Sequence, residues 1–281
     1  MQGKVVVITG GTSGIGQVSA ERLAATGARM VLVARSKNRG EAALSRLREL
    51  APAQAHTIYY GDVSRLADLN RLAEEIRSAE PRIDVLINNA GALFGKRQVS
   101  EDGLELTFAT NHLSYFVLTH GLLGSLSAAG SARVVNTSSH AHRFGDIDFD
   151  NLQYEHDYKS FPAYGRSKLC NVLFTRVLAR RLAGTGITAN SLHPGFVKTR
   201  FGDNARSDLM SRALGLLKVF AISQEKGAET IVYLASSDDV AKTTGLYFYK
   251  CNPVAPSKLA QNDAVAERLW TETAKLAGIK E

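Results

Sequence analysis

Cysteine is scarce in this chain, with Cys170 and Cys251 as the only two among 281 residues. They lie far apart, with no CxxC motif or Cys/His cluster, so they indicate neither a disulfide framework nor a zinc site. Such sparse cysteines fit a reducing environment. We therefore expect a cytoplasmic protein without a metal centre.

Long hydrophobic runs and sequence breaks are also missing. The longest apolar run in the C-terminal half, LGLLKVFAI at 214–222, contains Lys218 and is far too short to cross a bilayer. Strand-forming residues begin almost at Met1, which predicts no signal peptide or N-terminal anchor. Prolines number only six, and no linker, low-complexity segment or repeat interrupts the chain. We expect no stable membrane span and interpret 1–281 as a single domain.

Clusters of like charge are absent although the chain is basic. Lysine and arginine total 34 against 27 acidic residues, a formal charge of +7. No run of five or more basic residues occurs, and the charges are mixed along helical stretches. The pattern argues against nucleic acid as a partner and favours a small anionic ligand.

Short apolar, β-branched runs alternate with longer amphipathic stretches along the whole chain. Such alternation predicts an α/β fold, a doubly wound Rossmann-type parallel sheet of about seven strands with helices on both faces. The expected strands are Val5–Thr9, Met30–Ala34, His56–Tyr60, Val85–Asn88, Ala132–Thr137, Thr188–His193 and Leu246–Tyr249; examples of the expected helices are Ile15–Thr26, Leu66–Ala79 and Ala163–Leu182.

Several helix ends are marked by capping residues. Ser64 precedes the expected helix Leu66–Ala79, and we expect it to cap the free amides there. Gly27 and Gly184 stand where helices should end, as left-handed C-terminal caps.

The first expected strand breaks into a glycine cluster, VVVITGGTSGIG at 5–16. Free amides and the helix dipole at the start of the following helix can bind a pyrophosphate, provided that side chains do not block it. A plain strand-to-helix turn seldom needs four glycines in seven residues. We predict a dinucleotide site lined by Gly10, Thr12, Ser13, Gly14, Ile15 and Gly16.

The glycine spacing and four later motifs resemble the short-chain dehydrogenases/reductases. The motifs are NNAG (88–91), NTSS (136–139), YGRSK (164–168) and HPGFVKT (193–199), in the order of that family. Within the family, NHLSYF, CNVLFTR and AERLW are similar to the retinol dehydrogenase-like branch. The resemblance implies an oxidoreductase that transfers hydride between a nicotinamide cofactor and a small, lipophilic aldehyde, ketone or alcohol.

Tyr164 and Lys168 stand four positions apart on an expected helix and so project from one face. An adjacent ammonium favours the phenolate, which would lower the tyrosine pKa and suit it to acid–base work. The resemblance assigns the pair this role, implies that both contact the cofactor, and adds that Lys168 holds the nicotinamide ribose. Ser138 and Ser139 both follow a strand, and the family pattern selects Ser139 to orient the substrate oxygen. The resemblance further implies that Asn111 supports a proton relay to Lys168.

Cofactor preference depends on the end of the second expected strand. Ala34 stands where NAD-preferring relatives carry Asp, and Arg35 follows, with Lys37 and Arg39 close behind. An arginine there accommodates a 2′-phosphate, so we predict NADP(H) over NAD(H), although Ser13 is not basic as in some NADP-using relatives. The motifs add further expected cofactor contacts: Asp62 and Val63 at the adenine, Asn88, Ala90 and Gly91 along the groove, and Pro194, Gly195, Val197 and Thr199 at the nicotinamide.

Two segments are expected to border the substrate. One is 140–163, between Ser139 and Tyr164, and the other is 201–223, an apolar lid that could instead be core or a membrane-surface contact. The acidic stretch 146–157 matches calcium-loop positions only in part, because Asn151 replaces the glycine at position six. His140 and His142 could face substrate, but no third ligand is spaced to make a metal site.

Alternatives to this interpretation are a non-catalytic NADP(H)-sensing regulator, an NAD-preferring alcohol dehydrogenase of the same fold, and a sugar-nucleotide epimerase or dehydratase. The resemblance also implies a homodimer or homotetramer paired through Leu104–Leu123 and Ala163–Leu182, unless those stretches are internal.

Overall fold

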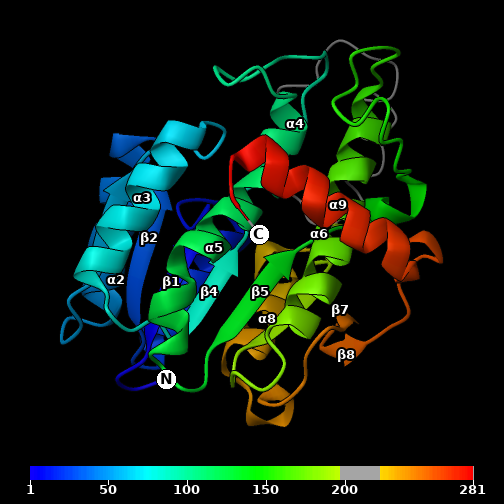
Figure 1. Ribbon diagram of the computed structural model, residues 1–281. Helices are drawn as coiled ribbons and strands as arrows, with labels where there is room; N and C mark the ends of the chain where they lie inside the picture. Colours follow the sequence, from blue (N-terminus) through cyan, green and yellow to red (C-terminus); the bar gives the residue numbers. More distant parts are fainter. Residues whose placement is uncertain (197–221, 281) are drawn as a thin grey trace.

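The computed structural model describes residues 1–196 and 222–280. Within them, eight strands form one sheet in the order β3-β2-β1-β4-β5-β6-β7-β8 (Figure 1). The strands are β1 Val5–Thr9, β2 Arg29–Ala34, β3 Thr57–Tyr60, β4 Val85–Asn88, β5 Arg133–Thr137, β6 Thr188–Leu192, β7 Tyr247–Tyr249 and β8 Asn252–Pro253. The first seven are parallel, which confirms the predicted α/β fold, and β8 is antiparallel to β7. The interpretation as a single domain stays a prediction.

Helices cover both faces of the sheet, as Figure 1 shows. They are α1 Gly14–Ala25, α2 Lys37–Leu50, α3 Leu66–Ala79, α4 Leu106–Phe108, α5 Ser114–Ser127, α6 Ser160–Arg181, α8 Gln224–Ser236 and α9 Asp263–Ala277; single turns lie at η1 Ala109–Leu113, η2 His140–Phe144, η5 Asp238–Val240 and η6 Leu259–Gln261. Neighbouring β1 residues face opposite ways. Val6 and Ile8 belong to the core shared with α1, α2 and α8, whereas Val7 belongs to the core shared with α3, α5, α6 and α9.

Trp270 of the C-terminal helix α9 is buried against α5 and α6. Its ring centroid lies 4.9 Å from that of Phe116 and 5.7 Å from that of Phe174. Arg180 of α6 reaches both Asp263 and Glu267 of α9. The helices α5 and α6 therefore pack within this chain against its own C-terminal helix.

The expected cap of α3 is wrong. Ser64 directs its hydroxyl to the Asp62 carboxylate, at 2.7 Å, and makes no cap hydrogen bond. Instead Asp102, from a loop far along the chain, accepts the amide of Leu66 at 2.9 Å. The end of α1 is as predicted: Gly27 has φ +91°, and its amide donates to Ala24. Gly184 is also left-handed, with φ +81°, just beyond the end of α6.

The order of the strands reverses between β1 and β4. In open α/β sheets the carboxyl ends of the strands at such a reversal form the ligand crevice. The NNAG and glycine-rich segments both begin there, and β5 brings its own carboxyl end alongside β4. The fold therefore places three predicted motifs at one edge of the sheet.

Two expected absences concern membranes and metals. No helix among residues 1–196 and 222–280 is long and apolar enough to cross a membrane. In the same ranges no group of three or more His, Cys, Asp or Glu side chains could hold a metal ion. Asp146, which opened the partial calcium-loop match, pairs with Arg166 of α6 at 2.9 Å.

Candidate active site

The glycine turn is packed tightly against the chain itself. A Cβ on Gly16 would lie 2.2 Å from the Gly10 carbonyl oxygen and 2.4 Å from Asn89 Nδ2, and one on Gly10 would lie 2.9 Å from Ala90 Cα. Gly14 has φ +58°, a conformation that other residues rarely adopt. Three of these glycines are thus required by the turn's own geometry, in addition to any need for a phosphate to approach it.

Asn89 holds the glycine turn to the end of β4. Its side-chain amide donates to the carbonyls of Thr9 and Gly10, at 3.1 and 3.3 Å. In return Thr9 Oγ1 accepts the amides of Asn89 and Ala90, both at 3.0 Å. Neither Thr9 nor Asn89 is among the predicted contacts, although Asn89 stands in the NNAG motif between two of them.

The beginning of α1 suits an anion. Its N-cap, Ser13, is exposed and forms no cap hydrogen bond through its side chain, so the first amides are left for a ligand. Thr12 is half-buried beside it, and Ile15 packs against the sheet. These residues fit the pyrophosphate of a dinucleotide.

Tyr164 and Ser139 come together at the carboxyl edge of the sheet. Tyr164 lies in the second turn of α6, and its side chain hydrogen-bonds that of Ser139. Ser138 points elsewhere: it is buried, and its hydroxyl donates to the carbonyl of Lys168 at 2.7 Å. The geometry therefore separates the two serines, with Ser139 beside the tyrosine and Ser138 supporting α6.

Lys168 is buried under Tyr164. Its Nζ donates to the carbonyl of Thr137 at 3.1 Å and lies 5.7 Å from the centroid of the Tyr164 ring. A Cβ on Gly91 would come within 3.3 Å of that Nζ and 3.2 Å of Asn111 Oδ1. Any side chain at position 91 would therefore crowd the lysine and the asparagine, the groups expected to hold the ribose of the cofactor.

Asn111 occupies a π-helical turn, η1, between α4 and α5. Its side chain exchanges hydrogen bonds with the backbone of Ala92, at 2.7 and 2.9 Å, and donates to Ser167 Oγ. The backbone carbonyl of Asn111 accepts a hydrogen bond from the side-chain amide of Asn171 of α6. Turns of this kind often occur at functional sites, but the sequence predicts only a continuous helix there.

Burial shifts both central pKa values in this site. It raises the pKa of Tyr164 to about 12, and the hydrogen bond from Ser139 opposes that rise. It lowers the pKa of Lys168 to about 7. The expectation that the lysine lowers the tyrosine pKa is therefore wrong: desolvation raises it.

Arg35 and Asp62 meet at the other end of the groove. Arg35 Nη1 lies 3.3 Å from Asp62 Oδ2, and the arginine side chain is 68% exposed. The other Asp62 oxygen accepts the amide and hydroxyl of Ser64, and these hydrogen bonds and Arg35 lower the pKa of Asp62 despite partial burial. Val63 packs against the core beside it.

The remaining expected contacts are only partly described. Asn88 is fully buried and donates to Asn136 and Thr119, so its side chain braces the sheet. Gly195, which follows Pro194, has φ +91°, and a Cβ there would lie 2.7 Å from Ile222 Cδ1. Val197, Thr199 and most of the expected lid, 201–221, lie outside the described residues.

Fold and site together define a Rossmann-type oxidoreductase with a Tyr–Ser–Lys–Asn cluster. The family model described as short chain dehydrogenase matches residues 4–210. Retinol dehydrogenase 14 of Homo sapiens is 39% identical over 99% of this chain and 88% of its own length. Retinol dehydrogenase 12 of Mus musculus is 41% identical over 99% and 87%. This chain therefore belongs to the short-chain dehydrogenase/reductase family.

Solved structures agree with this assignment. A protein of undescribed function from Mycobacterium Paratuberculosis matches with a TM-score of 0.80 and 31% identity, covering 99% of this chain and 95% of that one. Actinorhodin polyketide ketoreductase, solved with NADPH, matches with a TM-score of 0.67 and 26% identity, covering 87% and 94%.

Proposed function

We propose that this protein is an NADP(H)-dependent oxidoreductase that interconverts a small lipophilic aldehyde or ketone with its alcohol. The observation that carries the proposal is the hydrogen bond between the Tyr164 and Ser139 side chains, with Lys168 buried below and Gly91 close to its Nζ. A substrate oxygen at these two hydroxyls would meet two donors at once.

Tyr164 is the proton donor in the direction of reduction. Because burial raises its pKa to about 12, its hydroxyl is protonated at neutral pH and can pass a proton to the developing alkoxide. Ser139 holds the same oxygen by a hydrogen bond. In the reverse direction the Tyr164 oxygen takes the proton of the alcohol. The nicotinamide, when bound, supplies or accepts the hydride.

Three features support NADP(H) over NAD(H). Ala34 provides no carboxylate to bind a ribose 2′-hydroxyl, and Arg35 is exposed next to it. The N-cap of α2, Ser36, makes no side-chain cap, so the first amides of that helix remain for a phosphate. NADPH is also the cofactor in the structure of the related actinorhodin ketoreductase.

Aromatic side chains beside the site support a lipophilic substrate. Phe144 is 64% exposed and Phe196 is 46% exposed. Phe144 is adjacent to His140 and to Phe161, with ring centroids 6.2 and 5.9 Å away. The segment 140–163 thus offers an apolar wall next to Ser139, and relatives named retinol dehydrogenases fit such a substrate class.

The test is turnover of NADPH and NADH with a panel of lipophilic aldehydes and ketones, comparing the wild type with Tyr164→Phe. We expect kcat/KM to be about 10–100-fold higher with NADPH, the effect of hydrogen bonds to a charged group. Tyr164→Phe should lower kcat about 10²–10⁴-fold. NADPH affinity, measured by fluorescence, should change much less than kcat.

Each outcome has a distinct meaning. Equal turnover by Tyr164→Phe would refute the proton-donor role, and preference for NADH would refute the argument from Arg35. Cofactor binding without turnover of any carbonyl or matching alcohol would instead support the regulator that senses NADP(H).

A further inference from the structure

His142 lies directly behind the catalytic serine, in the single turn η2 that Ser139 begins. It is fully buried. Its Nδ1 is 2.8 Å from the Ser139 carbonyl oxygen, and its Nε2 is 3.0 Å from the backbone nitrogen of Ser257. The ring therefore bridges the serine and a segment 115 positions further along the chain.

These two neighbours determine the tautomer of His142. The Ser257 amide can only donate, so Nε2 must accept and carries no hydrogen. The Ser139 carbonyl can only accept, so Nδ1 must carry the hydrogen and donate. Burial lowers the pKa of His142 to about 4, which keeps the ring neutral at ordinary assay pH. The arrangement is satisfied by the neutral Nδ1–H form and by no other.

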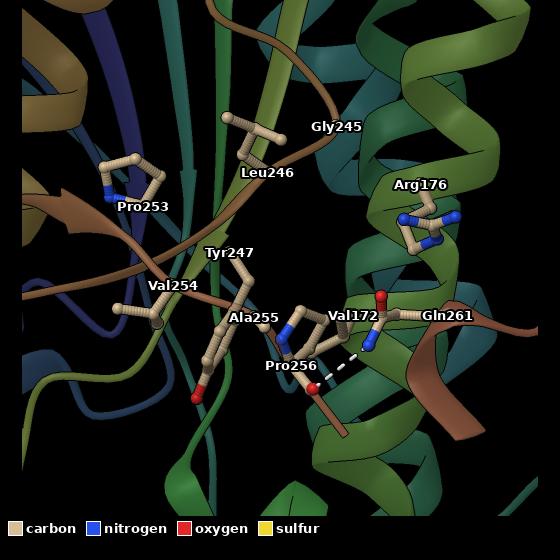
Figure 2. A pocket seen from close by; sticks show the side chains of 10 residues that line it. All are labelled: Val172, Arg176, Gly245, Leu246, Tyr247, Pro253, Val254, Ala255, Pro256 and Gln261. Carbon is tan, nitrogen blue, oxygen red and sulfur yellow. Dashed lines mark hydrogen bonds between the residues drawn. The ribbon is translucent and has the colours of Figure 1, made fainter. Parts of the chain in front are cut away.

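Tyr247 adds a second side-chain donor to the same carbonyl. Its hydroxyl lies 3.4 Å from the Ser139 oxygen and 3.3 Å from His142 Nδ1. Because Nδ1 already carries a hydrogen, the hydroxyl donates to the carbonyl. The Tyr247 side chain also forms one wall of a cavity of about 330 Å³ between α6 and β7 (Figure 2).

The hydrogen bonds to the Ser139 backbone carbonyl also restrict the position of the Ser139 side chain. The backbone amide of His142 also donates to the Ser139 oxygen, and the amide of Ala141 donates to Ser139 Oγ at 3.2 Å. With the peptide plane held from one side and the hydroxyl from the other, Ser139 Oγ has little freedom to leave Tyr164. Catalytic groups misplaced by about 1 Å can lose 10²-fold in rate.

We propose that His142 is a positioning residue for the reaction: through its Nδ1–H and the Ser257 amide it holds the Ser139 peptide, and with it the hydroxyl that orients the substrate oxygen. This inference rests on the proposed function. It adds a dependence of turnover on a residue that does not touch substrate and on the C-terminal segment around Ser257.

Two substitutions separate the two halves of the bridge. His142→Asn places an amide near the position of Nδ1 and can still donate to the Ser139 carbonyl. His142→Gln places its amide near the position of Nε2 and can still accept from Ser257, but it leaves the carbonyl without that donor. We expect His142→Gln to lower kcat about tenfold or more, with the KM for NADPH unchanged, and His142→Asn to retain most of the wild-type kcat. Lys226→Gln, at a side chain on α8 that is 65% exposed, is the control and should behave as wild type.

Several results would overturn the proposal. One is equal kcat in His142→Gln and the wild type; another is an equal loss of kcat in both variants in step with a fall in melting temperature, which indicates stability alone. The ¹⁵N spectrum of histidine-labelled protein gives a readout that needs no turnover: a hydrogen on His142 Nε2 refutes the inference even if no substrate is found. Failure of the proposed function shows instead as a wild type without turnover.

Discussion

Lys168 places an ammonium group in the buried interior of this site, at a cost in stability. Lys168 is 2% exposed, its described hydrogen bond is to a carbonyl rather than a carboxylate, and burial lowers its pKa to about 7. A charge without a buried counter-charge destabilises the folded state. The proposed function gives a reason for a destabilising residue at this position, because enzymes often lose stability at their active sites.

Lys168→Met should make the protein more stable and inactive. In the unfolded chain this lysine keeps its ordinary pKa, near 10.5, so between about pH 7 and 10.5 the unfolded state binds more protons and wild-type stability rises with pH. We expect the variant to gain about 1–4 kcal/mol in free energy of unfolding at pH 7, and the gain to shrink towards pH 10.

Urea unfolding of both proteins from pH 6.5 to 9.5 measures this difference. Lys226→Met, at a side chain that is 65% exposed, is the control and should change nothing. A Lys168→Met variant that is less stable than the wild type at every pH would show that the ammonium is stabilised in the fold.

At the scale of single elements, the N-terminus of α3 depends on a distant residue. Asp102 Oδ2 accepts the amide of Leu66, whereas the residue next to the helix that looked like a cap, Ser64, is turned towards Asp62. An acidic cap also interacts favourably with the helix dipole. The loop that carries Asp102 is thereby joined to α3.

Asp102→Ala should cost about 1 kcal/mol of stability, the usual loss for a helix N-cap. Glu101→Ala is the matched control, because the ion pair of Glu101 with Arg65 is exposed and is worth about 0–1 kcal/mol. Thermal unfolding compares the two. Equal melting temperatures for both variants would mean that water replaces the Asp102 carboxylate as acceptor for the Leu66 amide without loss of stability.

Local patterns predicted the elements well and their long-range contacts poorly. The seven parallel strands were placed to within one residue at each end, because most of them are short apolar, β-branched runs between polar breaks. The two-residue strand β8 has exposed residues and no pattern of its own. The π turn at Asn111 has the same residue types as an α-helix, so nothing in the sequence marks it.

The same limit applies to the site. Tyr164, Ser139, Lys168 and Asn111 were predicted from motifs, and the structure brings them together. The contact of His142 with Ser257 joins residues 115 positions apart, and no spacing rule reaches that distance. Side chains that touch the ligand follow motifs, while those that hold them depend on the packing of the whole chain.

At the scale of the whole molecule, the C-terminal helix decides which surfaces remain for partners. The resemblance implied pairing of subunits through the stretches Leu104–Leu123 and Ala163–Leu182, which contain α5 and α6. In the structure α9 lies across both helices (Figure 1), with Trp270 buried between Phe116 and Phe174. A partner subunit could reach that part of the surface only if α9 moved away.

We therefore expect a monomer in solution. Displacing α9 would expose Trp270 and neighbouring buried side chains such as Leu269, and burial of large side chains is worth about 1.5–3 kcal/mol each. It would also break the ion pairs of Arg180 with Asp263 and Glu267.

Light scattering during size-exclusion chromatography, at micromolar concentration and at low and high salt, should give the mass of one chain throughout. A stable dimer that persists when Arg180→Glu weakens the contact with α9 would show pairing through another surface. A dimer that forms only in that variant would show that α9 occupies a latent interface.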